Sequence, residues 1–162
     1  MLFRKADKSE AKTILSLYQA VIGTPFCTWN ELYPGEEEIW GDLSAGTLYV
    51  LEENGELIGA ISIVPENELD ELDCWKITDN VREFARVVLR PDCQQRGLSA
   101  YLVEGIIREL TKQHVAAIHI AVAKVNTPAQ KLYRKMGFDF CGEADLFGHS
   151  FFLCEKANLG VS

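Results

Sequence analysis

The segment from Cys93 to Ala100, which reads Cys-Gln-Gln-Arg-Gly-Leu-Ser-Ala, does most to constrain how this chain folds. Residues 84–91 before it are mostly apolar or β-branched and end at a proline, which predicts a strand. Apolar residues between Leu98 and Leu110 recur at helical spacing. A glycine turn that joins a strand to a helix leaves backbone N–H groups unpaired at the positive end of the helix dipole. The segment therefore predicts a binding site for an anion such as a phosphate.

The composition is that of one ordinary globular domain, which we expect to span residues 1–162. Hydrophobic residues make up 48% of the chain, and no apolar run is long enough to cross a membrane. The first residues lack the apolar stretch of a signal peptide. Five cysteines without a Cys-x-x-Cys pair predict reduced thiols in the cytoplasm. The three histidines show no metal-ligand spacing, so no metal is expected.

Charge is distributed unevenly along the chain. The first 80 residues carry 5 basic and 16 acidic side chains, and the remaining residues carry 11 and 8. The acidic half argues against nucleic acid as a partner, because binding there depends on neutralising phosphates. The basic excess lies in the half that contains the predicted anion loop, which suits a phosphorylated ligand. An acidic surface that only aids solubility is the alternative for the first half.

Hydrophobic periodicity and turn residues predict a mixed α/β sheet with antiparallel parts. Asn54-Gly55 between two apolar runs is typical of a hairpin. Thr127 is the expected N-cap of the last helix, with Pro128 in its first turn and Gly137 at its end. Residues 143–149 are expected to form a loop. The predicted strands are 2–5, 47–52, 57–64, 81–89, 115–122, 138–142 and 150–155, and the predicted helices lie within 8–22, 36–43, 98–113 and 127–136.

Two motifs together narrow the choice of phosphorylated ligand. The loop lacks the Gly-Lys-Ser/Thr of a Walker loop and the Gly-x-Gly-x-x-Gly of a dinucleotide fold. Gln94-Gln95-Arg96-Gly97-Leu98-Ser99 resembles the acyl-CoA loop of the GNAT superfamily of N-acetyltransferases, with Ser99 in place of the usual final Gly or Ala. Asn126-Thr127-Pro128-Ala129, followed by Leu132-Tyr133 and Met136-Gly137-Phe138, resembles a second signature of that family. The motif resemblance covers about residues 81–155.

The resemblance implies an α/β (α+β) fold of the GNAT type, with a mostly antiparallel central sheet, splayed central strands and flanking helices. It implies acetyl-CoA as the acyl donor, with the pantetheine arm along the strand before Pro91 and the pyrophosphate on the N–H groups of residues 95–100. Lys131 or Arg134 is implied for the 3′-phosphate. The implied cofactor-binding residues are Val87, Val88, Leu89, Gln94, Gln95, Arg96, Gly97, Leu98, Ser99, Ala100, Asn126, Ala129 and Tyr133.

The resemblance also implies catalytic roles. Tyr133 is the residue expected to protonate the departing thiolate, although its spacing beside Leu132 also fits a core aromatic. Glu83 is the expected general base, directly or through a water, because some members carry a catalytic glutamate at this spacing, although many carry the acid where Ala85 stands. A solvated glutamate at the start of the strand is the alternative. A backbone N–H near residues 88–89 is expected to polarise the thioester carbonyl. Asn126 is expected either to contact the cofactor or to organise the entry to its helix.

The acceptor is implied to lie on the acidic, N-terminal side. The expected binding residues are Phe26, Trp29 and Tyr33 in the loop 23–35, joined by the loop 143–149 and the acidic segment 66–73 with Trp75. Carboxylates and aromatic faces suit a small primary amine or an amino-acid-like metabolite. A protein lysine or N-terminus as acceptor, or a non-catalytic acyl-CoA-binding module, are the alternatives. No nucleic acid or membrane partner is expected, and a homodimer is compatible with the family.

Overall fold

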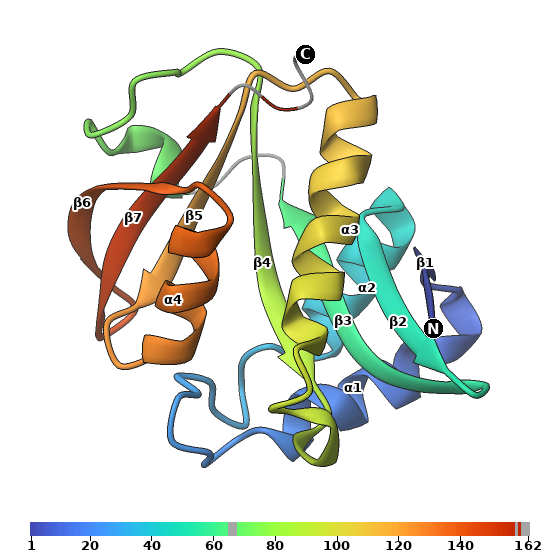
Figure 1. The fold of residues 1–162 in the computed structure, drawn as a ribbon. Coiled ribbons are helices and arrows are strands. Elements are labelled where there is room, and N and C mark those ends of the chain that lie inside the picture. The colour runs from blue at the N-terminus through green and yellow to red at the C-terminus, as the bar shows by residue number, and fades with distance from the viewer. Residues whose placement is uncertain (65–67, 158, 160–162) are drawn as a thin grey trace. The chain divides into compact units, whose positions relative to one another are not determined.

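The structure is a computed structural model that describes residues 1–64, 68–157 and 159 (Figure 1). The chain forms two compact units, one from Met1–Ile63 and Ala85–Arg108, the other from Val64–Phe84 and Glu109–Ser162. The strand order is β1-β2-β3-β4-β5-β7-β6. Strand β4 (Val81–Leu89) contributes residues to both units. The predicted mixed and mostly antiparallel α/β sheet is confirmed, with β4 and β5 as its parallel pair.

The first unit builds its core from helices packed on a short antiparallel meander. The Asn54-Gly55 hairpin is confirmed, because both residues adopt positive φ angles, 53° and 81°, and join Glu53 directly to Glu56. No helix within the described part of the chain is long and apolar enough to cross a membrane. The elements of this unit are β1 (Leu2–Lys5), α1 (Ala11–Ala20), α2 (Glu36–Ala45), β2 (Leu48–Glu53), β3 (Glu56–Val64) and α3 (Leu98–Lys112), the last ending beyond it.

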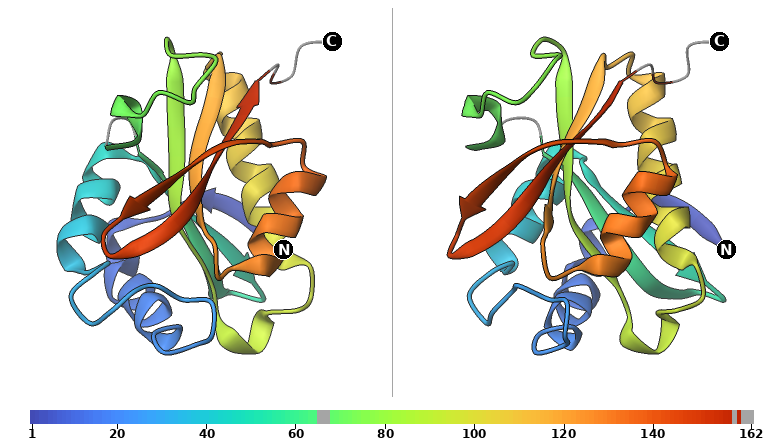
Figure 2. Two further views of the ribbon diagram at one scale, coloured as in Figure 1. Left: turned by 90° about the vertical axis from the view of Figure 1, so that its left-hand side faces the viewer. Right: turned by 60° about the vertical axis from the view of Figure 1, so that its left-hand side comes forward.

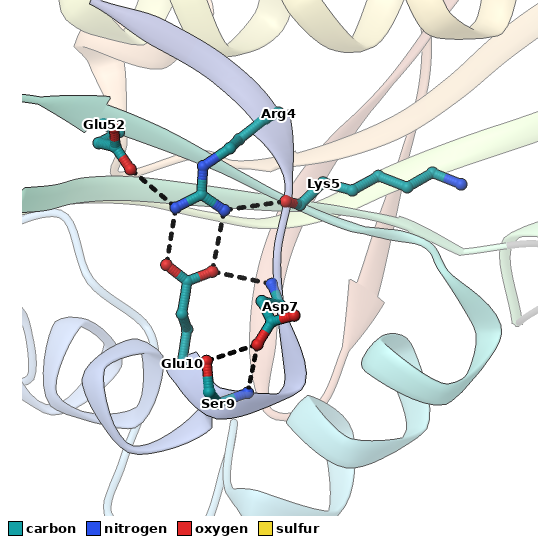
Figure 3. A network of polar contacts seen from close by, with 6 residues as sticks. All are labelled: Arg4, Lys5, Asp7, Ser9, Glu10 and Glu52. Carbon is teal, nitrogen blue, oxygen red and sulfur yellow. Dashed lines mark hydrogen bonds and ion pairs between the residues drawn. The ribbon is translucent and has the colours of Figure 1, made fainter. Parts of the chain in front are cut away.

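A polar network fixes the junction between β1 and α1 (Figure 3). The guanidinium of Arg4 donates to both carboxylate oxygens of Glu10, at 2.9 and 2.7 Å, and to Glu52 at 2.8 Å. Glu10 also accepts from the backbone N–H of Asp7, and Asp7 accepts from that of Ser9. These reciprocal bonds form a capping box before the first helix.

Acid should weaken this network measurably. The hydrogen bond from Arg4 lowers the pKa of Glu10 below its usual value in the folded chain. The unfolded chain therefore binds more protons in acid, so the stability that Glu10 contributes is present above its unfolded pKa and is lost as pH falls through the folded one. We expect the difference in unfolding temperature between the wild type and Glu10→Gln to shrink as pH falls from 7 to below about 4. A difference independent of pH would contradict this account.

Gly59 in β3 allows a close approach between neighbouring elements of the first unit. A Cβ there would lie 2.9 Å from the side chain of Leu89 and 2.9 Å from the backbone oxygen of Val88. We expect Gly59→Ala to lower the free energy of unfolding by about 1–3 kcal/mol, measured by urea denaturation. Gly41→Ala is the control, because a Cβ at that helical glycine meets nothing within 4 Å and should be neutral or stabilising. Equal stabilities of the two variants would contradict the prediction.

The second unit contains the parallel pair and a long hairpin. Only three residue pairs join β4 to β5, from Val81 with Ala117 to Glu83 with His119. In Figure 2 the hairpin of β6 and β7 crosses in front of β5, and β7 pairs with β5 along the whole of β5. The elements of this unit are β5 (Ala117–Ala123), α4 (Thr127–Lys135), β6 (Asp139–Leu146), β7 (His149–Ala157) and a 3-10 turn at Glu68–Glu71.

The predicted loop at residues 143–149 is wrong. Both strands of the hairpin continue to its tip, where Leu146 pairs with His149 and the two turn residues Phe147 and Gly148 have φ angles of 54° and 79°. Strand β6 lies at the edge of the sheet and has no fully buried residue, so its sequence lacks the apolar run of a buried strand. Residues 65–67, which include the start of the acidic segment 66–73 expected near the acceptor, lie outside the described residues.

Candidate active site

The anion loop follows directly from the end of β4. A 3-10 turn at Pro91–Cys93 leads to Gln95 and Gly97, whose φ angles are 66° and 73°, and α3 begins at Leu98. Left-handed residues next to right-handed ones turn successive N–H groups toward one side, which forms an anion-binding concavity. The first N–H groups of α3 have no intrahelical partners. This backbone is suited to hold phosphate oxygens.

The side chains of the loop serve mainly to hold it in place. Gln94 donates from its amide to the backbone oxygen of Leu89 at 3.3 Å. Arg96 donates to both carboxylate oxygens of Glu53, at 3.1 and 2.8 Å, and these bonds raise the pKa of Arg96. Arg96, one of the implied cofactor-binding residues, is thus already paired with a carboxylate. An anion in this loop would therefore be held mainly by backbone N–H groups.

Gly97 has a left-handed backbone conformation, which favours a residue without a Cβ. A Cβ there would touch nothing within 4 Å, so a substitution acts through the left-handed backbone alone. That conformation costs other residues about 1–2 kcal/mol, so Gly97→Val should weaken binding of coenzyme A about tenfold by calorimetry. Gly148→Val, with a φ of 79° at the tip of the β6–β7 hairpin, is the matched control. If both variants bind like the wild type, the loop does not hold the ligand.

Strand β4 carries an irregularity that the sequence did not predict. Arg86, in the middle of the strand, has a φ of 53°, a left-handed conformation that interrupts regular pairing. The ladder with β5 ends at Glu83, so Val87, Val88 and Leu89 make no pair in it. Backbone groups of this stretch are the ones predicted to bind the pantetheine arm.

A mostly buried ion pair, with side chains 12% and 13% exposed, anchors Arg86 within the first unit. Its guanidinium donates to both oxygens of Asp42 at 2.9 and 2.8 Å and to the hydroxyl of Tyr33 at 3.1 Å. Ser62, fully buried, donates to the same carboxylate at 2.7 Å. Burial opposes the charge of Arg86, but Asp42 outweighs it, so the pKa of Arg86 is raised. The Tyr18 hydroxyl is buried without a partner among the described residues, and burial raises its pKa.

The three aromatic residues predicted to bind the acceptor have different surroundings. Trp29 packs edge-on against Tyr18, with ring centroids 5.4 Å apart, and belongs with the core of the first unit. Phe26 and Tyr33 are each 43% exposed. The Tyr33 hydroxyl accepts a hydrogen bond from Arg86, which fixes the position of that ring.

Tyr133 lies in the second unit, on α4. Its ring contacts Phe84 and Phe138 with centroid separations of 5.9 and 5.6 Å, and it is 7% exposed. Burial raises the pKa of Tyr133, so its hydroxyl keeps its proton. The residue therefore has the packing of a core aromatic and the protonation state of an acid at once.

Asn126 caps α4, and the predicted cap at Thr127 is wrong. The Asn126 side chain accepts from the backbone N–H of Ala129 at 3.2 Å, while Thr127 is the first helical residue. Asparagine satisfies the free N–H groups of the first turn better than the threonine after it. Of the two implied cations, Arg134 stacks on the Phe140 ring at 3.8 Å, and Lys131 is exposed.

The general-base candidate has a neighbour that the sequence did not single out. Glu83 pairs in the β4–β5 ladder with His119, a buried histidine 2.9 Å from buried Glu155 of β7. In the sequence, this pair is marked by a polar residue beside apolar ones in each of two strands, His119 in β5 and Glu155 in β7. The buried histidine and glutamate thus satisfy each other's hydrogen bonding. Nothing in their spacing along the chain placed them together.

Known proteins share both the sequence and the fold. A family model described as the acetyltransferase (GNAT) family matches residues 14–138. UPF0039 protein C11D3.02c of Schizosaccharomyces pombe is 32% identical over 114 residues, which cover 70% of this chain and 67% of that protein. The L-methionine sulfoximine/L-methionine sulfone acetyltransferase of Pseudomonas aeruginosa is 23% identical over 156 residues, covering 91% and 86%.

Solved structures agree in fold. A GNAT-family acetyltransferase from Streptococcus agalactiae matches with a TM-score of 0.79 and 22% identity over 97% of this chain and 95% of that one. The structure of yncA from Salmonella typhimurium with its cofactor acetyl-CoA matches with a TM-score of 0.75 and 20% identity, over 97% and 93%. The family match spans most of the chain and includes the anion loop and Tyr133. The chain therefore belongs to the GNAT family of acetyltransferases.

Proposed function

We propose that residues 1–162 act as one N-acetyltransferase domain, which moves the acetyl group of acetyl-CoA to a primary amine by direct attack in a ternary complex. The observation that carries the proposal is the loop in which left-handed Gln95 and Gly97 precede the N-terminus of α3. The acceptor class is a small amino-acid-like amine. It is supported by the Pseudomonas relative, whose name gives L-methionine sulfoximine and L-methionine sulfone as its substrates.

The chain's own backbone holds the donor in this proposal. N–H groups of residues 95–100 take the pyrophosphate, and backbone groups of Val87–Leu89 take the pantetheine amides. Bound acetyl-CoA supplies an activated acetyl thioester. Because Arg96 is paired with Glu53, its contribution to the phosphates is smaller than that of the backbone.

Three groups of the chain serve the transfer. A backbone N–H near Val88 or Leu89 polarises the carbonyl as negative charge develops on its oxygen. Tyr133 gives its proton to the departing sulfur, and burial of its hydroxyl, which raises its pKa, keeps that proton in place before the transfer. An amine with a pKa of about 10.4 must lose a proton before it attacks, and Glu83 is the candidate base, directly or through a water.

The first 80 residues carry 16 acidic and 5 basic side chains, and this negative charge complements the positive charge of the acceptor amine. Such a field draws a cationic amine toward the enzyme. Phe26, exposed in the loop before α2, offers an aromatic face to it. These features support a small cationic acceptor without identifying its side chain.

The test is release of the coenzyme A thiol from acetyl-CoA across a panel of amines, each with an enzyme-free control. The panel holds L-methionine sulfone, L-methionine sulfoximine, the free amino acids and a lysine-containing peptide. We expect turnover with small amino acids and little with the peptide. Turnover of the peptide alone would favour a protein acetyltransferase. Binding of coenzyme A without turnover of any amine would favour a non-catalytic module.

A further inference from the structure

Two cysteines of the second unit lie in contact, although they are 67 positions apart in the sequence. The Sγ atoms of Cys74 and Cys141 are 2.9 Å apart, and both residues are half-buried free thiols. Two sulfur atoms joined in a disulfide lie about 2.05 Å apart, so these two need to approach each other by less than about 1 Å to bond. The fold has therefore brought together two groups that can react with each other.

A β-bulge in β6 gives Cys141 its orientation. The ladder between β6 and β7 skips Cys141, because its register shifts between Phe140 and Gly142. A bulge of this kind bends the strand and changes the direction in which the extra side chain points. The residue that the bulge sets apart from the regular pairing is the one whose thiol contacts Cys74.

The glycine that follows the bulge leaves room for the second cysteine. A Cβ at Gly142 would lie 3.0 Å from the Cβ of Cys74 and 3.2 Å from its Sγ. Protein interiors are closely packed, so any larger residue at this position would push Cys74 away from β6. The bulge and the glycine are two separate features of β6 that serve the same contact.

The segment that carries Cys74 is itself packed in place. The 3-10 turn Glu68–Glu71 precedes it, and the indole of Trp75 donates to the backbone oxygen of Leu69 at 2.8 Å. Leu69 and Trp75 are buried with Leu153 of β7 in an apolar cluster, and both cysteines pack against this cluster. The thiol of Cys74 is therefore presented to β6 by an ordered segment.

We propose that Cys74 and Cys141 form a redox modification site, at which a small disulfide such as oxidised glutathione converts the two thiols into a disulfide bond. The thiolate of Cys74 attacks one sulfur of the oxidant, and one glutathione thiolate leaves. Cys141 then attacks Sγ of Cys74, and the second glutathione leaves. The protein exchanges two S–H bonds for one S–S bond, while the oxidant is reduced to two thiols that take up the two protons. The new bond fastens residues 68–75 to β6.

The surroundings of Cys141 account for the order of the two steps. Burial, together with the hydrogen bond to Cys74, raises the pKa of Cys141 to about 12. The thiolate is the attacking form of a cysteine, so Cys141 is a poor nucleophile toward an oxidant arriving from solution. In the second step its target sulfur is already in contact, and this proximity offsets the small fraction of thiolate.

The first test is mass spectrometry of the wild-type chain after incubation with oxidised glutathione, with the remaining thiols trapped by alkylation. We expect a pair of peptides linked through Cys74 and Cys141. Cys141→Ser should instead retain a glutathione on Cys74, because the second step lacks its thiol. Cys27→Ser, at a half-buried cysteine of the first unit, is the matched control and should form the bond like the wild type.

The same incubation in urea shows whether the fold directs the reaction. The unfolded chain should give mixed pairings and glutathione adducts among its five cysteines. A folded wild type whose Cys74 and Cys141 stay reduced, carry separate glutathiones or pair with other cysteines would overturn the proposal. An equal yield of the Cys74–Cys141 bond in the folded and the unfolded chain would also overturn it.

The second test measures what the bond does to the protein. It closes a loop of 67 residues, which restricts the unfolded chain much more than the folded one. Oxidation should therefore raise the unfolding temperature by roughly 5–15 °C, and dithiothreitol should reverse the rise. Cys141→Ser treated in the same way should show no such rise. An oxidised wild type that unfolds at or below the temperature of the reduced protein would contradict the proposal. Neither test involves acetyl transfer, so both results are independent of the proposed function.

Discussion

Replacing Tyr133 with phenylalanine should lower kcat roughly a hundredfold or more, the usual contribution of a positioned proton donor. The substitution removes one hydroxyl and keeps the ring that packs on Phe84 and Phe138. The unfolding temperature and the KM for acetyl-CoA should therefore change little. Steady-state kinetics with saturating acetyl-CoA and the best acceptor of the panel measure the effect.

Tyr101→Phe provides the matched control for this prediction. Tyr101 is on α3 and is 52% exposed, so loss of its hydroxyl should leave kcat unchanged. Because the proposed acid acts on the leaving sulfur, the loss in Tyr133→Phe should be similar for every acceptor amine. A Tyr133→Phe enzyme with the wild-type kcat would show that Tyr133 is only a core aromatic, the alternative that its spacing allowed from the start.

Asp42→Ala should lower the free energy of unfolding by about 3 kcal/mol or more. The variant leaves the mostly buried guanidinium of Arg86 without its carboxylate and takes the acceptor from the fully buried hydroxyl of Ser62. An uncompensated buried charge is costly because neither water nor another anion replaces the lost partner. Urea denaturation at neutral pH, followed by the fluorescence of the tryptophans, gives the free energy directly.

Two further variants show whether burial is the cause. Glu56→Ala removes the carboxylate of a surface pair, since the side chain of Glu56 is 70% exposed beside Arg90, and should cost less than about 1 kcal/mol. Adding Arg86→Met to Asp42→Ala should recover part of the lost stability, because it removes the unpaired charge. Equal losses for Asp42→Ala and Glu56→Ala would contradict the buried-pair account.

Much of the fold could be predicted because its signals are local. The bounds of β4 agree with those expected, since an apolar run ends at Pro91. The first hairpin followed from Asn54-Gly55, which supplies two positive φ angles. The second hairpin turn, at Phe147-Gly148, was missed because a phenylalanine rarely takes a left-handed conformation and the exposed strand β6 has little apolar pattern.

The features of the site also separate into those found from local sequence signals and those found only in the structure. The anion loop could be found from the sequence because glycine and the start of a helix are local features of a short segment. The pairs Arg86–Asp42 and His119–Glu155 join residues 44 and 36 positions apart, and only the packed chain brings each together. The pairing of Arg96 with Glu53 was missed for the same reason, since a charged side chain carries no mark of its partner. Local motifs indicated the donor site, while the contacts of the ionisable side chains came from the structure.

Calorimetric titration of the wild-type protein with coenzyme A is the measurement that tests the central claim most directly. We expect one binding site per chain, about tenfold weaker binding in Gly97→Val, and unchanged binding in Gly148→Val. Coenzyme A should also raise the unfolding temperature of the wild type, as any ligand of the native state does. No binding heat and no shift in unfolding temperature at millimolar coenzyme A would contradict the acetyl-CoA-dependent function.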